Sequence, residues 1–198
     1  MRGMEVSRSP ETRECLLEAA QHLFAAHGYH GASIRDIVGA CGVSNAALYY
    51  HFGSKQGLYF EVLREYLAAV VKELQEADAG KGTSRNRLSQ VALTYATIIL
   101  SSENLLQTLL RDAAQFDPED ILRLLPELSH QIPAVLARIL EDGIGAGELR
   151  RVPPLRTGLL LLGMVNAITA QRLVTKAKTT LEEDTDLALD ILYEGIGV

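Results

Sequence analysis

The chain has 198 residues, 47% of them hydrophobic and 22% charged, which excludes a disordered protein and is enough for one domain or two small ones. Two cysteines exclude a disulfide-dense secreted scaffold, and no stretch of about 20 residues is apolar enough to span a membrane, so we expect a cytoplasmic protein without membrane contact. The formal net charge of -6 argues against a nucleic-acid partner, because domains that bind nucleic acid are usually basic.

Apolar residues recur at helical spacing along the whole chain, and no stretch alternates as a half-buried strand does. The pattern therefore predicts an all-α fold of about nine helices. Capping residues and glycines suggest where each helix begins and ends. In chain order we expect helices near 10–28, 33–40, 45–52, 57–78, 85–101, 104–115, 129–142 and 155–174, and a last one that begins near 182. Pro118 and Pro126 are expected to interrupt the chain before the helix near 129–142.

Two of the short predicted helices form a recognisable pair. The helices at 33–40 and 45–52 are separated by a four-residue turn that contains Gly42, and Ser33 and Ser44 stand at their N-cap positions. A short helix, a turn with glycine and a second short helix are typical of the helix-turn-helix, whose second helix enters the DNA major groove. The pair therefore indicates a DNA-binding function, despite the net charge.

Small and polar side chains remain on the outer face of this pair after its apolar residues are assigned to the core. Asn45 can donate to and accept from an adenine edge, and alanine methyl groups can meet the methyl group of thymine. The N-terminus of the first helix, tyrosine hydroxyls and a cation can hold phosphates. We expect DNA contacts from Ser33, Ile34, Arg35, Ser44, Asn45, Ala46, Ala47, Tyr49, Tyr50, His51 and Lys55, with Ser33, Tyr49, Tyr50 and Lys55 on the phosphates.

The same region resembles the N-terminal signature of the tetracycline-repressor (TetR) family of bacterial transcriptional regulators. The matching residues lie in 28–37, 42–44 and 48–55, and they keep fixed offsets from one another. Val38 and Cys41 depart from the pattern, because the family commonly has alanine at both positions. The resemblance covers about residues 10–60, and the rest of the chain is compatible with the family in length and helix count.

The resemblance implies a helix-turn-helix DNA-binding domain at 1–56 and a helical ligand-binding and dimerisation domain at 57–198. It also implies a homodimeric transcriptional regulator, most often a repressor, that binds a near-palindromic operator in double-stranded DNA. A small, largely apolar effector would release the protein from DNA.

The second domain offers candidates for effector binding and for dimerisation. The helix at 155–174 is apolar nearly all round, so both of its sides should be covered, one by the core and one by a second copy. Expected dimer contacts are Leu159, Leu162, Leu187, Ile191 and Leu192. Expected effector contacts are Tyr66, Tyr95, Ile98, Ile99, Gln107, Leu109, Phe116, Met164 and Asn166, of which the polar members would orient the ligand.

The spacing of residues in the sequence does not support a metal site or a catalytic site. Four of the five histidines and both cysteines lie in the first 51 residues, but their spacing fits no metal site, so we expect no metal and no cofactor. No set of residues has the spacing of a nucleophile with its base, so we expect no enzyme. The alternative is a helical small-molecule binding protein or adaptor that does not use DNA, and the motif at 33–55 argues against it.

The net charge is unevenly distributed. The first 60 residues carry five basic and five acidic side chains, so the whole acidic surplus lies in the rest of the chain. A neutral DNA-binding domain can still hold phosphates through helix N-termini, hydroxyls and a few cations. We therefore expect modest affinity for random DNA and a weak dependence on salt.

Overall fold

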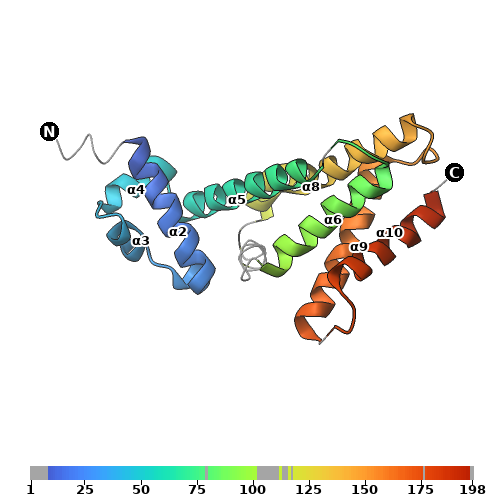
Figure 1. The fold of residues 1–198 in the computed structure, drawn as a ribbon. Coiled ribbons are helices and arrows are strands. Elements are labelled where there is room, and N and C mark those ends of the chain that lie inside the picture. The colour runs from blue at the N-terminus through green and yellow to red at the C-terminus, as the bar shows by residue number, and fades with distance from the viewer. Residues whose placement is uncertain are drawn as a thin grey trace. The chain divides into compact units, whose positions relative to one another are not determined.

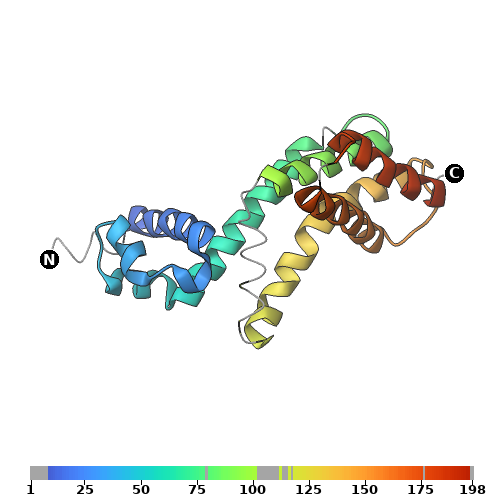
Figure 2. The same ribbon diagram turned by 90° about the horizontal axis from the view of Figure 1, so that it is seen from below.

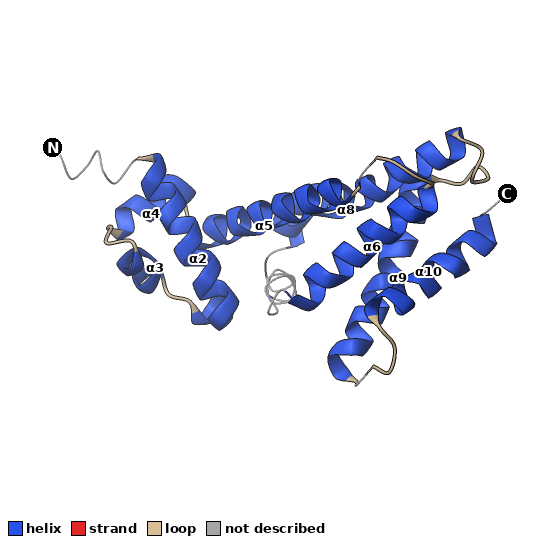
Figure 3. Ribbon diagram, in the orientation of Figure 1, coloured by secondary structure: helices blue, strands red, loops and turns tan. Residues whose placement is uncertain are grey.

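The computed structural model describes residues 9–78, 80–101, 112, 116, 118–175 and 177–196. Figure 3 shows helices and loops in these ranges and no strand, which confirms the all-α prediction. The prediction of about nine helices is close, since the described ranges contain eight. They are α2 (Pro10–Gly31), α3 (Ile34–Ala40), α4 (Asn45–Phe52), α5 (Lys55–Ala77), α6 (Ser84–Ser101), α8 (Pro118–Gly145), α9 (Pro154–Val174) and α10 (Leu181–Ile196) (Figure 1).

Two helix boundaries differ from the sequence prediction, and the helix predicted near 104–115 lies largely outside the described residues. Helix α2 was expected to end at Gly28, and the backbone angles of Gly28 are indeed non-helical. A further helical turn follows, however, so the helix extends to Gly31. Helix α8 begins at Pro118 and continues through Pro126, whereas both prolines were expected to lie in an interruption. Proline is well suited to the first turn of a helix, and a proline further along removes one N–H donor without ending a long helix.

The chain divides into two compact units. Unit 1 comprises Met1–Leu67 and Glu103–Leu124, and unit 2 comprises Ala68–Ser102 and Leu125–Val198. The division falls inside α5 and inside α8, so each of these helices contributes to both units. The first compact unit therefore extends beyond the DNA-binding domain expected at 1–56 and includes the first half of α5.

In unit 1, helices α2, α3 and α4 pack on one another (Figures 1 and 2). Helix α2 begins at Pro10, and the hydroxyl of its N-cap Ser9 accepts the N–H of Thr12. Each helix contributes apolar side chains that are fully or almost fully buried. The core of unit 1 includes Leu16, Ala20, Phe24, Ile37, Val38, Leu48, Leu58, Tyr59 and Leu63.

In unit 2, helices α6, α9 and α10 pack on one another in pairs. Their buried side chains include Leu88, Val91, Leu161, Val165 and Leu189, and α8 adds Leu136, Ile139 and Leu140. Among the described helices, α9 alone is long and apolar enough to cross a membrane. The expectation that no stretch is long and apolar enough is therefore wrong for α9, because an apolar stretch can tolerate a charged residue such as Arg156 or Arg172 near its ends. One such helix is weak evidence for a membrane span, since a core helix can have the same length and composition, and α9 packs on α6 and α10.

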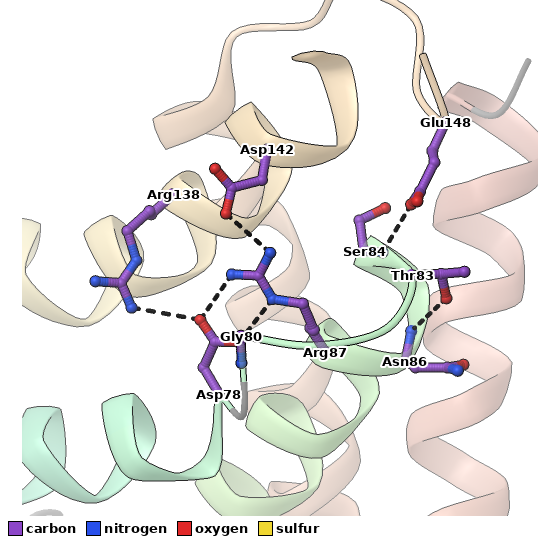
Figure 4. A network of polar contacts seen from close by, with 9 residues as sticks. All are labelled: Asp78, Gly80, Thr83, Ser84, Asn86, Arg87, Arg138, Asp142 and Glu148. Carbon is purple, nitrogen blue, oxygen red and sulfur yellow. Dashed lines mark hydrogen bonds and ion pairs between the residues drawn. The ribbon is translucent and has the colours of Figure 1, made fainter. Parts of the chain in front are cut away.

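A network of charged side chains joins the end of α5 to α6 and α8 (Figure 4). The Arg87 guanidinium donates to both carboxylate oxygens of Asp78 at 2.7 and 2.8 Å and to Asp142 at 2.8 Å. Asp78 also accepts from Arg138 at 3.3 Å.

The Asp78 side chain is 2% exposed and that of Arg87 is 10% exposed. Hydrogen bonds from Arg87 lower the pKa of Asp78 to about 2, and those to Asp78 raise the pKa of Arg87. The network fixes the end of α5 within unit 2.

Candidate DNA-binding site

Serine residues stand at the N-caps of both short helices, as the sequence predicts. The Ser33 hydroxyl accepts the N–H of Asp36 at 3.1 Å and donates to the Asp36 carboxylate at 2.6 Å, which caps α3. Ser44 is the N-cap residue of α4, but its side chain makes no capping hydrogen bond. The first turn of α4 therefore leaves this hydroxyl available to a ligand.

The turn between α3 and α4 depends on one glycine. Gly42 has a φ of 64°, a left-handed conformation that side chains with a Cβ rarely adopt. Its N–H donates to the carbonyl of Gly39 at 3.2 Å, and the next N–H, of Val43, donates to the carbonyl of Val38 at 3.0 Å. These bonds fold the chain back after α3 and so determine where α4 starts.

The outer surface of α4 carries five exposed residues, which we call the reading face: Ser44, Asn45, Ala46, Tyr49 and Tyr50. The two tyrosine side chains are about half exposed, with Tyr50 at 57%. Such exposure of adjacent aromatic residues is unusual on a helix whose other side is packed, and it indicates a surface that meets a partner.

One expected DNA contact is placed in the core instead. Ala47 is 2% exposed and shares the buried side of α4 with Leu48, so little of its surface is left for DNA, and its contact with DNA stays a prediction. Adjacent helical positions are only about 100° apart, so both can face the core. Of the other expected contacts, Ser33 and Arg35 are exposed, and Ile34, His51 and Lys55 are half-buried.

Lys55 has a partner inside unit 1. Its ammonium donates to the carbonyl oxygen of Tyr29 and lies 4.4 Å from the centre of the Tyr29 ring, and burial lowers the pKa of the ammonium. The Tyr29 N–H in turn donates to the Asp112 carboxylate at 2.5 Å. An ammonium has three N–H donors, so the bond to Tyr29 leaves donors for a phosphate. The phosphate contact of Lys55 therefore stays a prediction.

Phe116, an expected effector contact, belongs to an aromatic cluster in unit 1. Its ring centre lies 4.6 Å from that of Tyr29, 5.4 Å from Tyr59 and 5.2 Å from Phe60. Burial raises the pKa of the Tyr59 phenol, so this ring stays neutral. The cluster supports the end of α2 and the start of α5, the two elements that Lys55 also joins.

Two of the polar residues expected to orient an effector contact each other in unit 2. The Tyr95 hydroxyl of α6 donates to the Asn166 side-chain oxygen of α9 at 3.0 Å. Tyr95 is buried and Asn166 is exposed. Among the other expected contacts, Ile98 is buried, Tyr66, Ile99 and Met164 are half-buried, and Gln107 and Leu109 lie outside the described residues.

A surface hollow of about 360 Å³ lies where α9 leads into α10, and none of the expected effector contacts lines it. Arg172 and Lys178 are the cations that line it, and Arg172 is already paired with the Asp184 carboxylate and also donates to the carbonyl of Thr179 at 2.9 Å. Across the described part of the chain, no three His, Cys, Asp or Glu side chains gather as ligands of a metal ion would.

Helices α9 and α10 expose an apolar surface, which we call the apolar face: Leu159, Leu160, Leu173, Val174, Leu187 and Ile191. Leu160 is 67% exposed, although it was not among the expected dimer contacts. Leu162, an expected dimer contact, is 8% exposed and packs in the core of unit 2, so little of its surface is left for a second copy, while Leu192 is half-buried. A run of four leucines carries no periodicity, so it cannot show which of them face the core.

A disulfide is a feature that the sequence analysis did not predict. Cys15 of α2 and Cys41, the C-cap residue of α3, are bonded to each other, with their Cα atoms 5.9 Å apart. The sequence separates them by 26 positions, and neither lies in a spacing motif. A single disulfide is compatible with the expectation that the chain is not a disulfide-dense secreted scaffold.

Two family models match the chain. The model described as bacterial regulatory proteins, tetR family, matches residues 16–62, and the model described as tetracyclin repressor-like, C-terminal domain, matches residues 81–170. The first match contains the reading face and the α3–α4 turn. Together the two matches cover more than half of the chain.

Several known proteins are similar over most of this length. The fatty acid metabolism regulator protein of Bacillus subtilis is 21% identical over 182 residues, which are 91% of this chain and 93% of that protein. The transcriptional repressor KstR2 of Rhodococcus jostii is 28% identical over 135 residues, which are 68% of this chain and 66% of the repressor. A crystal structure of a putative TetR-family transcriptional regulator from Mesorhizobium loti has a TM-score of 0.81 and 21% identity, covering 96% of this chain and 99% of that one.

Proposed function

Because the chain belongs to the TetR family of bacterial transcriptional regulators, and is a transcription regulator and not an enzyme, we propose that it is a homodimeric repressor. In this proposal α4 is the recognition helix, and an effector bound by unit 2 releases the protein from its operator. The observation that carries the proposal is the reading face, which presents hydroxyl, amide and small side chains at the start of a helix that follows the α3–α4 turn.

The reading face divides into groups that would read bases and groups that would hold phosphates. Asn45 and Ala46 lie in the first turn of α4, and N-terminal residues of a recognition helix meet the base edges. The amide of Asn45 suits adenine, and the methyl group of Ala46 suits thymine. The hydroxyls of Ser33, Tyr49 and Tyr50 would bind phosphates, which fixes the position of α4 without reading sequence.

The apolar face supports the homodimer. Leucine, isoleucine and valine side chains exposed together on two neighbouring helices are costly in water and mark a surface that a partner covers. A two-fold dimer uses the same patch on both subunits and places two recognition helices on successive half-sites. Covering α9 in this way also explains its apolar character without a membrane, and it agrees with a cytoplasmic, DNA-bound protein.

The effector would act by population shift. A ligand that binds better to a conformation with wrongly spaced recognition helices weakens operator binding by the ratio of its two affinities. Apolar residues of α6 and α9 would bind it, and the Tyr95–Asn166 pair would orient it. A small, largely apolar effector is in keeping with a relative whose name refers to fatty acid metabolism.

The test is affinity selection of genomic DNA by the purified full chain, followed by a gel shift with the selected fragments. We expect recovery of a near-palindromic sequence, and the genes beside it would indicate the chemistry of the effector. If no fragment is retained even at low salt, the DNA-binding proposal fails and a helical small-molecule binding protein becomes the better interpretation.

A further inference from the structure

We propose that Cys15 and Cys41 form a reversible redox modification site in the helix-turn-helix, which reacts with low-molecular-weight disulfides such as that of glutathione. The site goes beyond the proposed function, since neither an operator nor an effector is needed for its chemistry. Only its consequence for DNA binding depends on the proposal that α4 reads DNA.

The distance between Cys15 and Cys41 and their exposure suit a reversible disulfide. The Cα atoms of Cys15 and Cys41 are 5.9 Å apart, inside the range of about 4.4–6.8 Å that disulfides require. Both residues are half-buried, so a small reagent can reach them, whereas a structural cysteine in a core would be inert. The sequence contains no third cysteine, so no other disulfide can form within the chain.

The reaction is a thiol–disulfide exchange in two steps. One cysteine thiolate attacks a sulfur of the small disulfide, which forms a mixed disulfide and releases one small thiolate. The second cysteine thiolate then attacks the protein sulfur of the mixed disulfide, which forms the Cys15–Cys41 bond and releases the second small thiolate. Two protein thiols are oxidised, one small disulfide is reduced to two thiols, and the protons of the cysteines pass to the released thiolates.

The Cys15–Cys41 bond lies where it can restrain the α3–α4 turn. Cys41 directly precedes Gly42, whose conformation directs the chain into α4, and Cys15 lies on α2, against which α3 and α4 pack. The bond therefore ties the start of the turn to the helix that supports it. Local opening of the α3–α4 turn should become rarer in the oxidised protein, because a covalent cross-link removes open conformations. The reading face would then be held in the arrangement described above.

The first experiment uses the full chain, reduced with a phosphine and then treated with glutathione disulfide. Non-reducing peptide mapping should recover a Cys15–Cys41 linked peptide, and a phosphine should remove it. Amide hydrogen exchange at Gly42 and Val43, whose N–H groups close the turn, should slow about tenfold or more on oxidation. A glutathione adduct without the internal bond, or unchanged exchange in the linked protein, would overturn the proposal.

The matched controls are Cys41→Ala and Cys15→Ala. Alanine is common at the position of Cys41 in the family that the sequence resembles, so this variant should fold, which circular dichroism can verify. Neither variant can form the internal bond, so the exchange rates at the turn should not respond to glutathione disulfide. A response of the same size in Cys41→Ala would show that the cross-link is not its cause.

A second experiment measures the affinity for one DNA duplex before and after oxidation. We expect the oxidised wild type to bind about threefold or more tightly than the reduced form, and Cys41→Ala to show no difference. Equal binding by the two wild-type forms would overturn the regulatory role of the bond. If neither form binds any DNA while the bond still forms, the proposed function fails and the redox site stands.

Discussion

The two surfaces that this protein offers to partners are built from different residues. The reading face of α4 consists of amide, hydroxyl and small side chains, whereas the apolar face of α9 and α10 consists of leucine, isoleucine and valine. The first suits a polar partner whose groups it can pair by hydrogen bonds, and the second suits a surface of its own kind. The difference teaches that the net charge of -6 does not argue against the proposed DNA contact, because the reading face contains no charged residue and would bind DNA through hydrogen bonds.

The largest effect should come from breaking the apolar face. In the double variant Leu160→Asp with Leu187→Asp, dimerisation would bury four carboxylates across the interface, so we expect the dimer to dissociate about 100-fold or more readily. Sedimentation velocity at micromolar concentration should show monomer. The double variant Ala68→Asp with Ala69→Asp, at two exposed positions of α5, adds the same charge and should remain dimeric. A double variant that sediments as wild type would remove the basis for a dimer at this face.

Stability should depend strongly on the charge network of unit 2. Among the described residues, Arg87→Ala leaves the buried Asp78 carboxylate with the Gly80 N–H and with Arg138 as its one remaining cation, which should cost about 3 kcal/mol of the free energy of unfolding. Urea denaturation measures this loss. Arg138→Ala removes the weaker and more exposed contact and should cost less than about 1 kcal/mol. Equal losses in the two variants would show that burial of the pair does not matter.

The same network predicts a pH dependence. The folded chain holds the pKa of Asp78 at about 2, below its ordinary value, so the carboxylate stabilises the fold above about pH 4. This contribution is lost as the pH falls from about 4 towards 2, because the carboxylate becomes protonated in the folded state as well. Denaturation of Asp78→Asn over this range should show a flatter profile than that of the wild type, and parallel profiles would contradict the assignment.

A smaller effect is expected when one phosphate contact is removed. Tyr49→Phe deletes only the hydroxyl, so affinity should fall about tenfold, and equally for operator and random duplex. Fluorescence anisotropy with both duplexes measures the two losses. Tyr193→Phe serves as the control, because that hydroxyl bonds to Ser84 in unit 2 and should not affect binding to DNA. A loss confined to the operator would reassign Tyr49 to base reading.

The smallest expected effect is the dependence of the affinity for DNA on salt concentration. With Arg35 and Lys55 as the cations near the reading face, a dimer would neutralise about four phosphates, which predicts a slope of about -4 for the logarithm of affinity against that of salt concentration. Titrations of one duplex at several salt concentrations give the slope. A slope steeper than about -8 would require about twice as many phosphate contacts as Arg35 and Lys55 of two chains can make, and would contradict their assignment as the main cations at this surface.

The parts of this structure that sequence could predict are those with local signals. The α3–α4 pair follows from the Ser33 cap, from Gly42 and from apolar residues within one turn of each other, and the structure places both helices within a residue of the expected bounds. The long helices α5, α6 and α9 were likewise predicted to within a few residues, because capping residues and glycines mark their ends.

Features that depend on contacts between distant residues could not be predicted. The Cys15–Cys41 bond and the Arg87–Asp142 pair join positions with no local pattern between them. The burial of Ala47 and of Leu162 depends on the exact rotation of a helix, and neither alanine nor a run of leucines reveals it. The sequence therefore defined the reading face almost completely and the apolar face only in part.

The most direct test of the account compares Asn45→Ala with wild type on two duplexes, the selected operator and a random sequence. If Asn45, in the first turn of α4, reads a base edge as we propose, the variant should lose about 1–3 kcal/mol of its preference for the operator while its affinity for random DNA changes little. The ratio of the two dissociation constants measures this preference. An equal loss of affinity for both duplexes, or no loss for either, would contradict the claim that α4 reads DNA through this face.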